Sequence, residues 1–419
     1  MTHQQREVSS VSALLEAVND ADVHRINVLG TLTDTPSFRL LPGQRLSGAR
    51  EGVAIQFQPR SDGIKLTRDN HVAQLTLLAD PDRAVVCNDT GVESLGRLVL
   101  RDLKVKGRVE LLAQKQVRAG HIDVQDIDIE YADARAGEDR PRGYGVEVIP
   151  SAFTLWNEQP DASITITADL TGIRVGRAGV PVRGSGVFVS GAGDTGGRMI
   201  VHRLETGAVY SDGGIAPGTP DRISAGVFVL YGARVSRVSN NGPVTTYGSN
   251  DMVLDNWGSV DQWIAHDAIT SYGPSSIGFV NFGTLDTLTL NAPIETFGQG
   301  SRGFNVYAGT VRRADFDRIT THADGAVGIQ LSQPVGSIAV HRGIETFGGI
   351  GDSLVKGVVV KLAAHPLSIK PGGTVDILEI EGGIQSHGEG VEPLDMHGSI
   401  QWFQVSGGIS SSSSTSRKP

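Results

Sequence analysis

The C-terminal half of the chain repeats one short phrase at intervals of 25 residues. The phrase starts with Ile or Val, has Thr or Ser two residues later and usually has Gly at its fifth position. Its copies start at Val244, Ile269, Ile294, Ile319 and Ile344 and, after a step of 40 residues, at Ile384 and Ile409. A short period that accepts insertions without losing its phase is typical of a solenoid, in which each repeat stacks on its neighbours.

Each repeat contains three stretches in which apolar and polar residues alternate, separated by glycine-rich corners. Alternation with a period of two indicates β-strands, and strands that recur once per repeat stack in parallel at about 4.8 Å per coil. We therefore predict an all-β, single-domain, right-handed parallel β-helix with three strands per 25-residue coil, its handedness following the general rule for parallel crossovers. Leucine-rich and calcium-binding nonapeptide repeats are excluded because their characteristic phrases are absent, and a propeller is excluded because its blade needs roughly 40 residues.

A short amphipathic helix is predicted before the coils. Residues 12–19 place apolar residues on one face after a Ser cap, and such a helix can close the open apolar end of a solenoid. The predicted organisation is an N-terminal segment with the capping helix at 1–22, the β-helix at 23–409 with strict coils from residue 244, long loops at 131–144, 207–225 and 363–374, and a disordered Ser-rich tail at 410–419.

The N-terminal part of the chain resembles the opening of the pectate-lyase-like β-helix superfamily. The resemblance covers residues 10–130 and rests on the capping helix followed by the phrases at 26–30, 43–48, 62–64 and 72–75. It implies a right-handed parallel β-helix and a carbohydrate polymer as ligand. The later phrase that runs from Ile269 to Phe279, and again from Ile294 to Phe304, is similar to repeats of autotransporter passenger domains.

Composition excludes several classes of partner. The net charge of −9 and the absence of a basic run argue against nucleic acid. The single cysteine, Cys87, cannot form an intrachain disulfide, and we expect it to be a small buried residue. No apolar run of 18 residues predicts a membrane span, and no signal peptide is recognisable, so we expect a cytoplasmic protein or one exported by a non-classical route. No cofactor and no metal site are predicted; a divalent cation such as Ca²⁺ is left open.

Stacking in register would turn each repeat position into a column of side chains. The Thr/Ser column and the pair Asn256 and Asn281 are expected to face inward and to hydrogen-bond along the stack. The fourth position of the phrase is expected to face outward and carries mostly rings: Tyr247, Tyr272, Phe297, His322, Phe347 and His387. A second ring column contains Trp257, Phe282 and Tyr307, and Glu295 and Glu345 alternate with the first.

Three roles for the ring columns stay open. Outward-facing rings could stack on the sugars of an extended glycan, pack into the core at the corners, or bury a contact between protomers. The predicted ligand-binding residues are Tyr247, Tyr272, Phe297, His322, Phe347, Glu295, Glu345 and Trp257. A further group of titratable residues surrounds Trp257 in one coil, namely Asp251, Asp255, Asp261, His266 and Asp267, and we expect these to be solvated turn residues.

The insertions are the predicted place for catalysis. Both 131–144 and 207–225 interrupt a coil after the same strand, so they should leave the solenoid at the same edge. Glycoside hydrolysis needs two carboxyl groups at a fixed separation, and β-elimination from uronates needs a base with cationic support. The catalytic candidates are Asp133, Glu138, Asp139, Arg142, Asp212 and Asp221.

Two functions follow as hypotheses. The first is a β-helix that binds a carbohydrate polymer and modifies it by lyase or hydrolase chemistry, which requires two carboxylates within about 10 Å of each other beneath the loops. The second is a non-catalytic structural or adhesin-like solenoid that forms homo-oligomers through its aromatic column. The partner is accordingly an extended glycan or a second copy of the chain.

Overall fold

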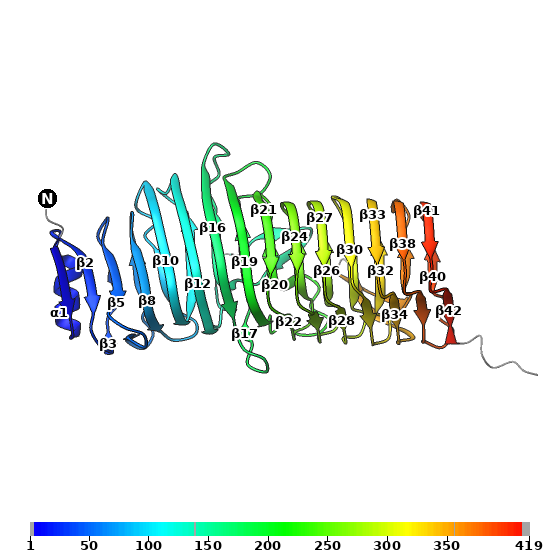
Figure 1. Ribbon diagram of the computed structural model, residues 1–419, viewed down its shortest axis with the longest axis horizontal. Helices are drawn as coiled ribbons and strands as arrows, with labels where there is room; N and C mark the ends of the chain where they lie inside the picture. Colours follow the sequence, from blue (N-terminus) through cyan, green and yellow to red (C-terminus); the bar gives the residue numbers. More distant parts are fainter. Residues whose placement is uncertain (1–3, 138–139, 356, 413–419) are drawn as a thin grey trace, which may run out of the picture. The chain divides into compact units, whose positions relative to one another are not determined.

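The computed structural model describes residues 4–137, 140–355 and 357–412, and in them it confirms an almost entirely β-stranded fold (Figure 1). The predicted helix is present as α1 (Val11–Asn19), and the Ser10 hydroxyl accepts a hydrogen bond from the backbone N–H of Ala13 at its first turn. α1 buries Leu14, Ala17 and Val18. A strand that was not predicted, β1 (Gln4–Val8), precedes the helix and pairs in parallel with β2 (Val23–Val28). None of the described residues belongs to a helix with the length and hydropathy needed to cross a bilayer.

The chain divides into two compact units. The first comprises residues 1–136, 150–208 and 230–235, and the second comprises 137–149, 209–229 and 236–419. In the first unit, one series of parallel pairings joins β2, β5 (Arg45–Gly48), β8 (His71–Leu78), β10 (Ser94–Lys106), β12 (Ala119–Tyr131) and β16 (Thr165–Val175). The other joins β4 (Phe38–Arg39), β7 (Ile64–Leu66), β9 (Ala84–Asn88), β11 (Arg108–Ala113), β15 (Ser151–Asn157) and β18 (Ser185–Ser190).

The second unit contains three parallel ladders, each with one strand per coil. The first contains β22 (Val244–Thr246), β25 (Ile269–Ser271), β28 (Ile294–Thr296), β31 (Ile319–Thr321), β34 (Ile344–Thr346), β39 (Ile384–Ser386) and β42 (Ile409–Ser411). The second contains β23 (Asp251–Asn256), β26 (Ile277–Asn281), β29 (Arg302–Val306), β32 (Val327–Leu331), β37 (Leu367–Ile369) and β40 (Leu394–Met396).

The third ladder contains β24 (Ser259–Ala265), β27 (Thr284–Leu290), β30 (Thr310–Phe316), β33 (Pro334–Val340), β38 (Thr374–Ile380) and β41 (Ser399–Val405), side by side in chain order (Figure 1). The register confirms the stacked column of Ile and Val, because Val244 is paired with Ile269, Ile269 with Ile294, and so on to Ile409. These side chains are buried in every coil except the last, where Ile409 is 44% exposed. The parallel β-helix is therefore confirmed.

The prediction for the inward polar residues is confirmed for the asparagine pair and wrong for the hydroxyls. The hydroxyls of Ser271, Thr296 and Thr321 bond within their own coil, to residues five positions later, rather than along the stack. Asn256 donates from Nδ2 to Oδ1 of Asn281 at 2.8 Å, one coil along the stack. The Thr and Ser side chains two residues after each buried Ile or Val are buried as well, at Thr246, Ser271 and Thr296. In the first unit Cys87 is mostly buried, and this burial raises the pKa of its thiol to about 12, so it is not a thiolate nucleophile at neutral pH.

The extra residues between the coils at 344 and 384 form a hairpin. Its strands, β35 (Ile350–Val355) and β36 (Val358–Ala363), pair antiparallel, and β37 follows as an ordinary strand of the second ladder. The predicted loop at 363–374 therefore contains β37, because phrase spacing counts inserted residues without showing where in the coil they leave. Likewise β42 includes the first two residues of the predicted tail, and residues 413–419 lie outside the described ones.

Candidate functional site

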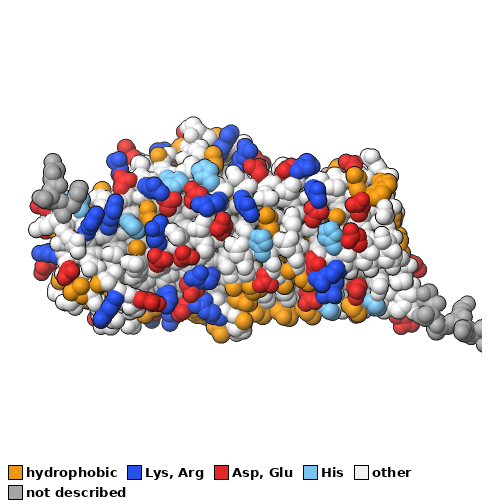
Figure 2. Space-filling model, viewed as in Figure 1, with side chains coloured by type: hydrophobic (Ala, Val, Ile, Leu, Met, Phe, Trp, Pro, Cys, Tyr) orange, Lys and Arg blue, Asp and Glu red, His pale blue; other side chains and the backbone are white. Residues whose placement is uncertain are grey.

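The rings at the fourth position of the phrase form one continuous stack. Adjacent ring centroids are 4.3–5.5 Å apart and the planes are within 13° of parallel from Tyr247 to His387. Tyr272, Phe297 and Phe347 are between 38% and 48% exposed. Hydrophobic side chains gather along the edge of the second unit over β22 and β28 in the space-filling view (Figure 2). We call the six rings Tyr247, Tyr272, Phe297, His322, Phe347 and His387 the ring ladder.

The ring ladder presents ring edges rather than ring faces to the solvent. Because each ring is covered on both sides by its neighbours at about van der Waals separation, a sugar cannot lie flat on the inner rings. Glu295 and Glu345 flank the ladder, and the Glu345 carboxylate lies 3.8 Å from Nε2 of His387. A molecule that binds at the ring ladder would therefore contact a row of ring edges and carboxylates. This is a broad surface rather than a binding pocket.

The catalytic candidates from the insertions lie in different surroundings. Arg142 and Asp221 lie on segments joined through Glu147, which pairs with Arg142 and donates its backbone N–H to the Asp221 carbonyl at 2.8 Å. Asp133 belongs to the first unit, where the Arg135 side chain donates to both of its carboxylate oxygens and holds the pKa of the acid below its usual value. Arg142 forms an ion pair with Glu147, and Asp212 accepts a hydrogen bond from the backbone N–H of Gly214 at 2.8 Å. Asp221 is exposed. Glu138 and Asp139 lie outside the described residues.

A cavity of about 310 Å³ lies within the second unit, between the second ladder and three segments that cover it. Its floor is formed by β23, β26 and β29, and its covering segments are 144–146, 220–223 and the tip of the β35–β36 hairpin. Hydrogen bonds hold each cover in place. Tyr144 donates to the Phe282 carbonyl at 3.3 Å, Asn250 donates to the Thr219 carbonyl at 2.8 Å, and the Leu354 N–H donates to the Ser275 hydroxyl at 3.0 Å.

Aromatic rings form one wall of this cavity. Trp257 meets Phe228 and Tyr144 edge-on at 5.0 and 5.1 Å, and Phe282 stacks on Tyr307 at 5.3 Å. The sequence predicted that this second ring column faces outward from the coil. It does so, but Tyr144 of the inserted loop packs over it, so that Trp257 is only 4% exposed. The column is thereby converted from an exposed strip into the wall of a pocket.

Asp255 lines the cavity from near the end of β23, paired in register with Phe228 and Val280. It is 0% exposed, so the expectation of a solvated turn residue is wrong for this residue. Burial raises the pKa of its carboxyl well above the ordinary value, and the Trp257 indole opposes this shift only in part. No other hydrogen bond reaches either carboxylate oxygen from the described residues. The available signal in the sequence was an acid between the apolar run at 252–254 and Trp257.

Asp251, on the same strand, is also buried but for a different reason. Its carboxylate accepts hydrogen bonds from the Ser224 hydroxyl and from the backbone N–H groups of Gly213 and Gly248 at 2.5, 3.1 and 2.7 Å. Burial still raises the pKa of Asp251, to about 6. Three donors make it a local anchor for the corner after the repeat phrase, and it does not line the cavity.

The cavity also holds a buried guanidinium. Arg302 is 1% exposed and donates to the Ser353 hydroxyl at 3.1 Å, the Gly300 carbonyl at 3.3 Å and the Gln330 amide oxygen at 3.4 Å. All three acceptors are neutral, and no carboxylate of the described residues forms an ion pair with this guanidinium. The Asn305 amide is buried beside Gln330 in the same ladder and has no hydrogen-bond partner in the described part of the chain.

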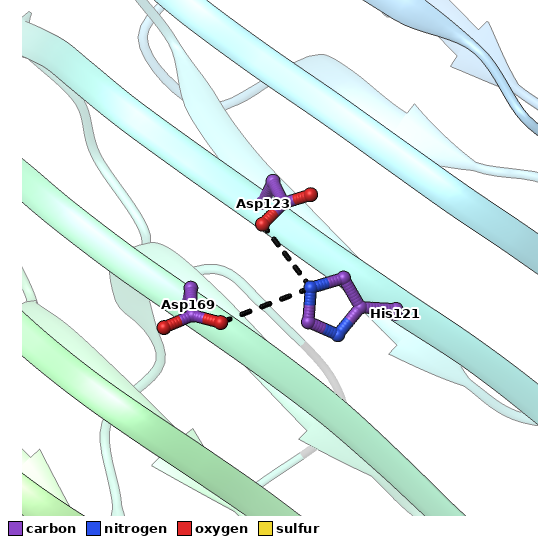
Figure 3. A group of neighbouring side chains, drawn as sticks. All are labelled: His121, Asp123 and Asp169. Carbon is purple, nitrogen blue, oxygen red and sulfur yellow. Dashed lines mark hydrogen bonds and ion pairs between the residues drawn. The ribbon is translucent and has the colours of Figure 1, made fainter.

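A separate titratable group lies in the first unit. His121 faces the carboxylates of Asp123 and Asp169, with Nε2 at 3.1 and 3.9 Å (Figure 3). The guanidinium of Arg97 pairs with Asp123, and Arg203 lies 3.4 Å from Asp169. Two arginines therefore already balance the two carboxylates, which fits an ion-pair network better than a cation site. The His-x-Asp spacing on one strand face was its signal in the sequence.

The cavity as a whole can bind a ligand better than it can hydrolyse a glycosidic bond. Glycoside hydrolysis by two carboxyl groups needs a second acid, and among the described residues Asp255 is the one carboxylate that lines the cavity. Aromatic walls with a few buried polar groups are typical of small-molecule sites. Comparisons of the chain with protein-family models, with curated proteins and with solved structures found no match.

Proposed function

We propose that this protein binds a carbohydrate polymer and that one sugar unit enters the cavity of the second unit. The proposal rests on the combination of four rings, Tyr144, Trp257, Phe282 and Tyr307, with the buried polar side chains of Asp255 and Arg302. Sugars have apolar C–H faces that pack on rings and hydroxyls that need fixed donors and acceptors, and this cavity supplies both. The resemblance of the N-terminal part to the pectate-lyase-like superfamily supports a carbohydrate ligand.

The size of the cavity limits what it takes. A volume of about 310 Å³ is at the lower end of ligand pockets, which run from about 300 to 1,000 Å³. One sugar ring fits, and the rest of a polymer would extend over the covering segments. Binding without hydrolysis is the activity we propose, because a second carboxylate is missing from the lining residues that are described.

Removing one ring from the cavity should weaken binding without unfolding the protein. Tyr144 is 53% exposed and lies on a covering segment, so Tyr144→Ala should leave the unfolding midpoint nearly unchanged. It should weaken glycan binding by roughly tenfold or more, since an aromatic contact and a hydrogen bond are lost. The measurement is a glycan-array screen followed by calorimetry on each hit. Tyr272→Ala in the ring ladder is the matched control and should bind like the wild type; equal losses in both variants would reject the cavity as the site.

The exposed ring edges favour a second role, which is self-association through the ring ladder. Tyr272, Phe297 and Phe347 are the large apolar side chains that remain most exposed on this edge, and a second copy would present the same spacing of rings. We expect a concentration-dependent dimer in sedimentation equilibrium at micromolar concentration. Tyr272→Lys should weaken the dimer by roughly tenfold, because it buries a charge in the contact. A wild-type protein that sediments as a monomer at every concentration would exclude this role.

A further inference from the structure

Among the described residues, the buried acid in the cavity has no cationic partner. Asp255 is surrounded by Phe228 and Val280 on the neighbouring strands and by Trp257 two residues along its own strand. No basic side chain contributes to lowering its pKa. An acid in this environment is costly in its ionised form, and nothing in the described surroundings offsets that cost.

The buried cation among the described lining residues lies in another part of the cavity. Arg302 is two coils further along the ladder than Asp255 and three residues nearer the start of its strand, since Met252, Ile277 and Arg302 share one register column. These offsets correspond to about 10 Å in each direction between the two Cα atoms. The Arg302 guanidinium is held by Ser353 and Gln330, beneath the hairpin. It therefore does not neutralise Asp255. Arg222, the other described basic residue that lines the cavity, is exposed and lies six positions before Phe228, the register partner of Asp255.

The rings around Asp255 also favour a positive charge. Four rings lie edge-on or tilted to one another, with centroids 4.5–5.8 Å apart: Tyr144, Phe228, Trp257 and Phe282. Their ring planes are therefore not parallel, and their faces point in different directions. Ring faces carry partial negative charge and attract ammonium groups within about 6 Å, most strongly when water is excluded. A carboxylate enclosed by several rings is the arrangement that recognises an organic cation.

We propose that the aromatic end of the cavity receives an ammonium group, and that the glycan bound there carries a free amino group on the sugar that enters. This inference rests on the proposed glycan-binding function and adds the chemical class of the sugar. An ammonium group would form an ion pair with Asp255 and contact the ring faces at the same time. An N-acetylated or a hydroxyl-bearing sugar has no charge to offer and would leave the acid uncompensated.

The test compares three β-1,4-linked trisaccharides at pH 7 by calorimetry: one of glucosamine, one of N-acetylglucosamine and one of glucose. The wild-type protein should bind the glucosamine trimer at least tenfold more tightly than the other two. Asp255→Asn should remove this preference and bind all three within about twofold of one another. Asp376→Asn is the matched control, because it removes the same charge from an exposed strand residue outside the cavity, and it should keep the preference.

The outcomes separate the two proposals. Equal binding of the three trimers by the wild type would overturn the ammonium inference and support glycan binding. Binding of tetramethylammonium, lost in Asp255→Asn, with no binding of any trimer would support the ammonium site and overturn the glycan. No binding of any of the four probes would overturn both. Near-ultraviolet circular dichroism of each variant confirms that the fold is intact, and a preference that survives in a folded Asp255→Asn protein would also overturn the inference.

Discussion

Asp255→Asn should make the protein more stable at neutral pH. The folded-state pKa of Asp255 is raised well above its unfolded value, so the folded protein holds a proton that the unfolded chain releases as pH rises above about 4. The free energy of unfolding of the wild type therefore falls as pH increases through that window. Asn has no such proton, and the variant should be more stable by about 1–3 kcal/mol at pH 7, with a difference that shrinks towards pH 4. Urea unfolding at both pH values measures this.

Asp251→Asn is the matched control for that experiment. It lies on the same strand and is equally buried, but its carboxylate accepts three hydrogen bonds, and an amide N–H₂ group cannot accept from those donors. We expect this variant to lose about 1–3 kcal/mol. If Asp255→Asn raises the free energy of unfolding and Asp251→Asn lowers it, Asp255 destabilises the folded protein. Functional residues commonly do so. If the Asp255→Asn protein is less stable than the wild type at both pH values, Asp255 has a structural role instead.

Phe304→Ala should be among the most destabilising single substitutions in the second unit. Phe304 is 0% exposed and lies in the inward column of the second ladder, 4.9 Å from the Phe316 ring and 6.0 Å from the Phe279 ring. Truncation removes buried area and leaves a void between closely packed coils. The expected loss in the free energy of unfolding is about 3–5 kcal/mol, measured by urea denaturation.

Phe297→Ala serves as the comparison within the same coil. Phe297 belongs to the ring ladder, is 38% exposed and loses only its face-to-face stacking on Tyr272 and His322 when it is truncated. We expect a loss of about 1 kcal/mol. The loss in the free energy of unfolding would then differ severalfold between two phenylalanines seven positions apart, because one side chain faces inward and the other outward. Similar losses for the two variants would contradict the register of the coils.

The architecture was predictable because the period of the sequence equals the step of the fold. In a parallel stack, residues 25 apart lie next to each other on hydrogen-bonded strands. The spacing of the repeated Ile, Thr and Asn residues therefore predicts which residues are paired. The capping helix was predictable for a similar reason, since Ser10 and the apolar face of 11–19 are local signals. The insertion was predicted at 363–374, whereas the inserted hairpin spans Ile350–Ala363. Its position was not predictable because an insertion does not repeat with the period of the coils.

The position of each ring was only half predictable. Strand alternation correctly placed both ring columns on the outside of the coil, at Tyr272 and Phe297 and at Trp257 and Phe282. Whether an outward side chain remains at the surface depends on what folds over it. One column stays exposed as the ring ladder, and the other is covered by Tyr144, which lies 138 positions before Phe282 in the chain.

Taken alone, the amino-acid sequence determined a stack of parallel coils, its inward columns and its helical cap, because each depends on neighbours one repeat away. Only the tertiary structure decided that three inserted segments close over β23, β26 and β29. It also decided that Asp255 and Arg302 are buried in the resulting cavity, whereas the loop acids Asp133 and Asp212 do not line it. Contacts between an irregular insertion and a distant coil carry no periodic signal, since they depend on side-chain packing in three dimensions rather than on backbone register.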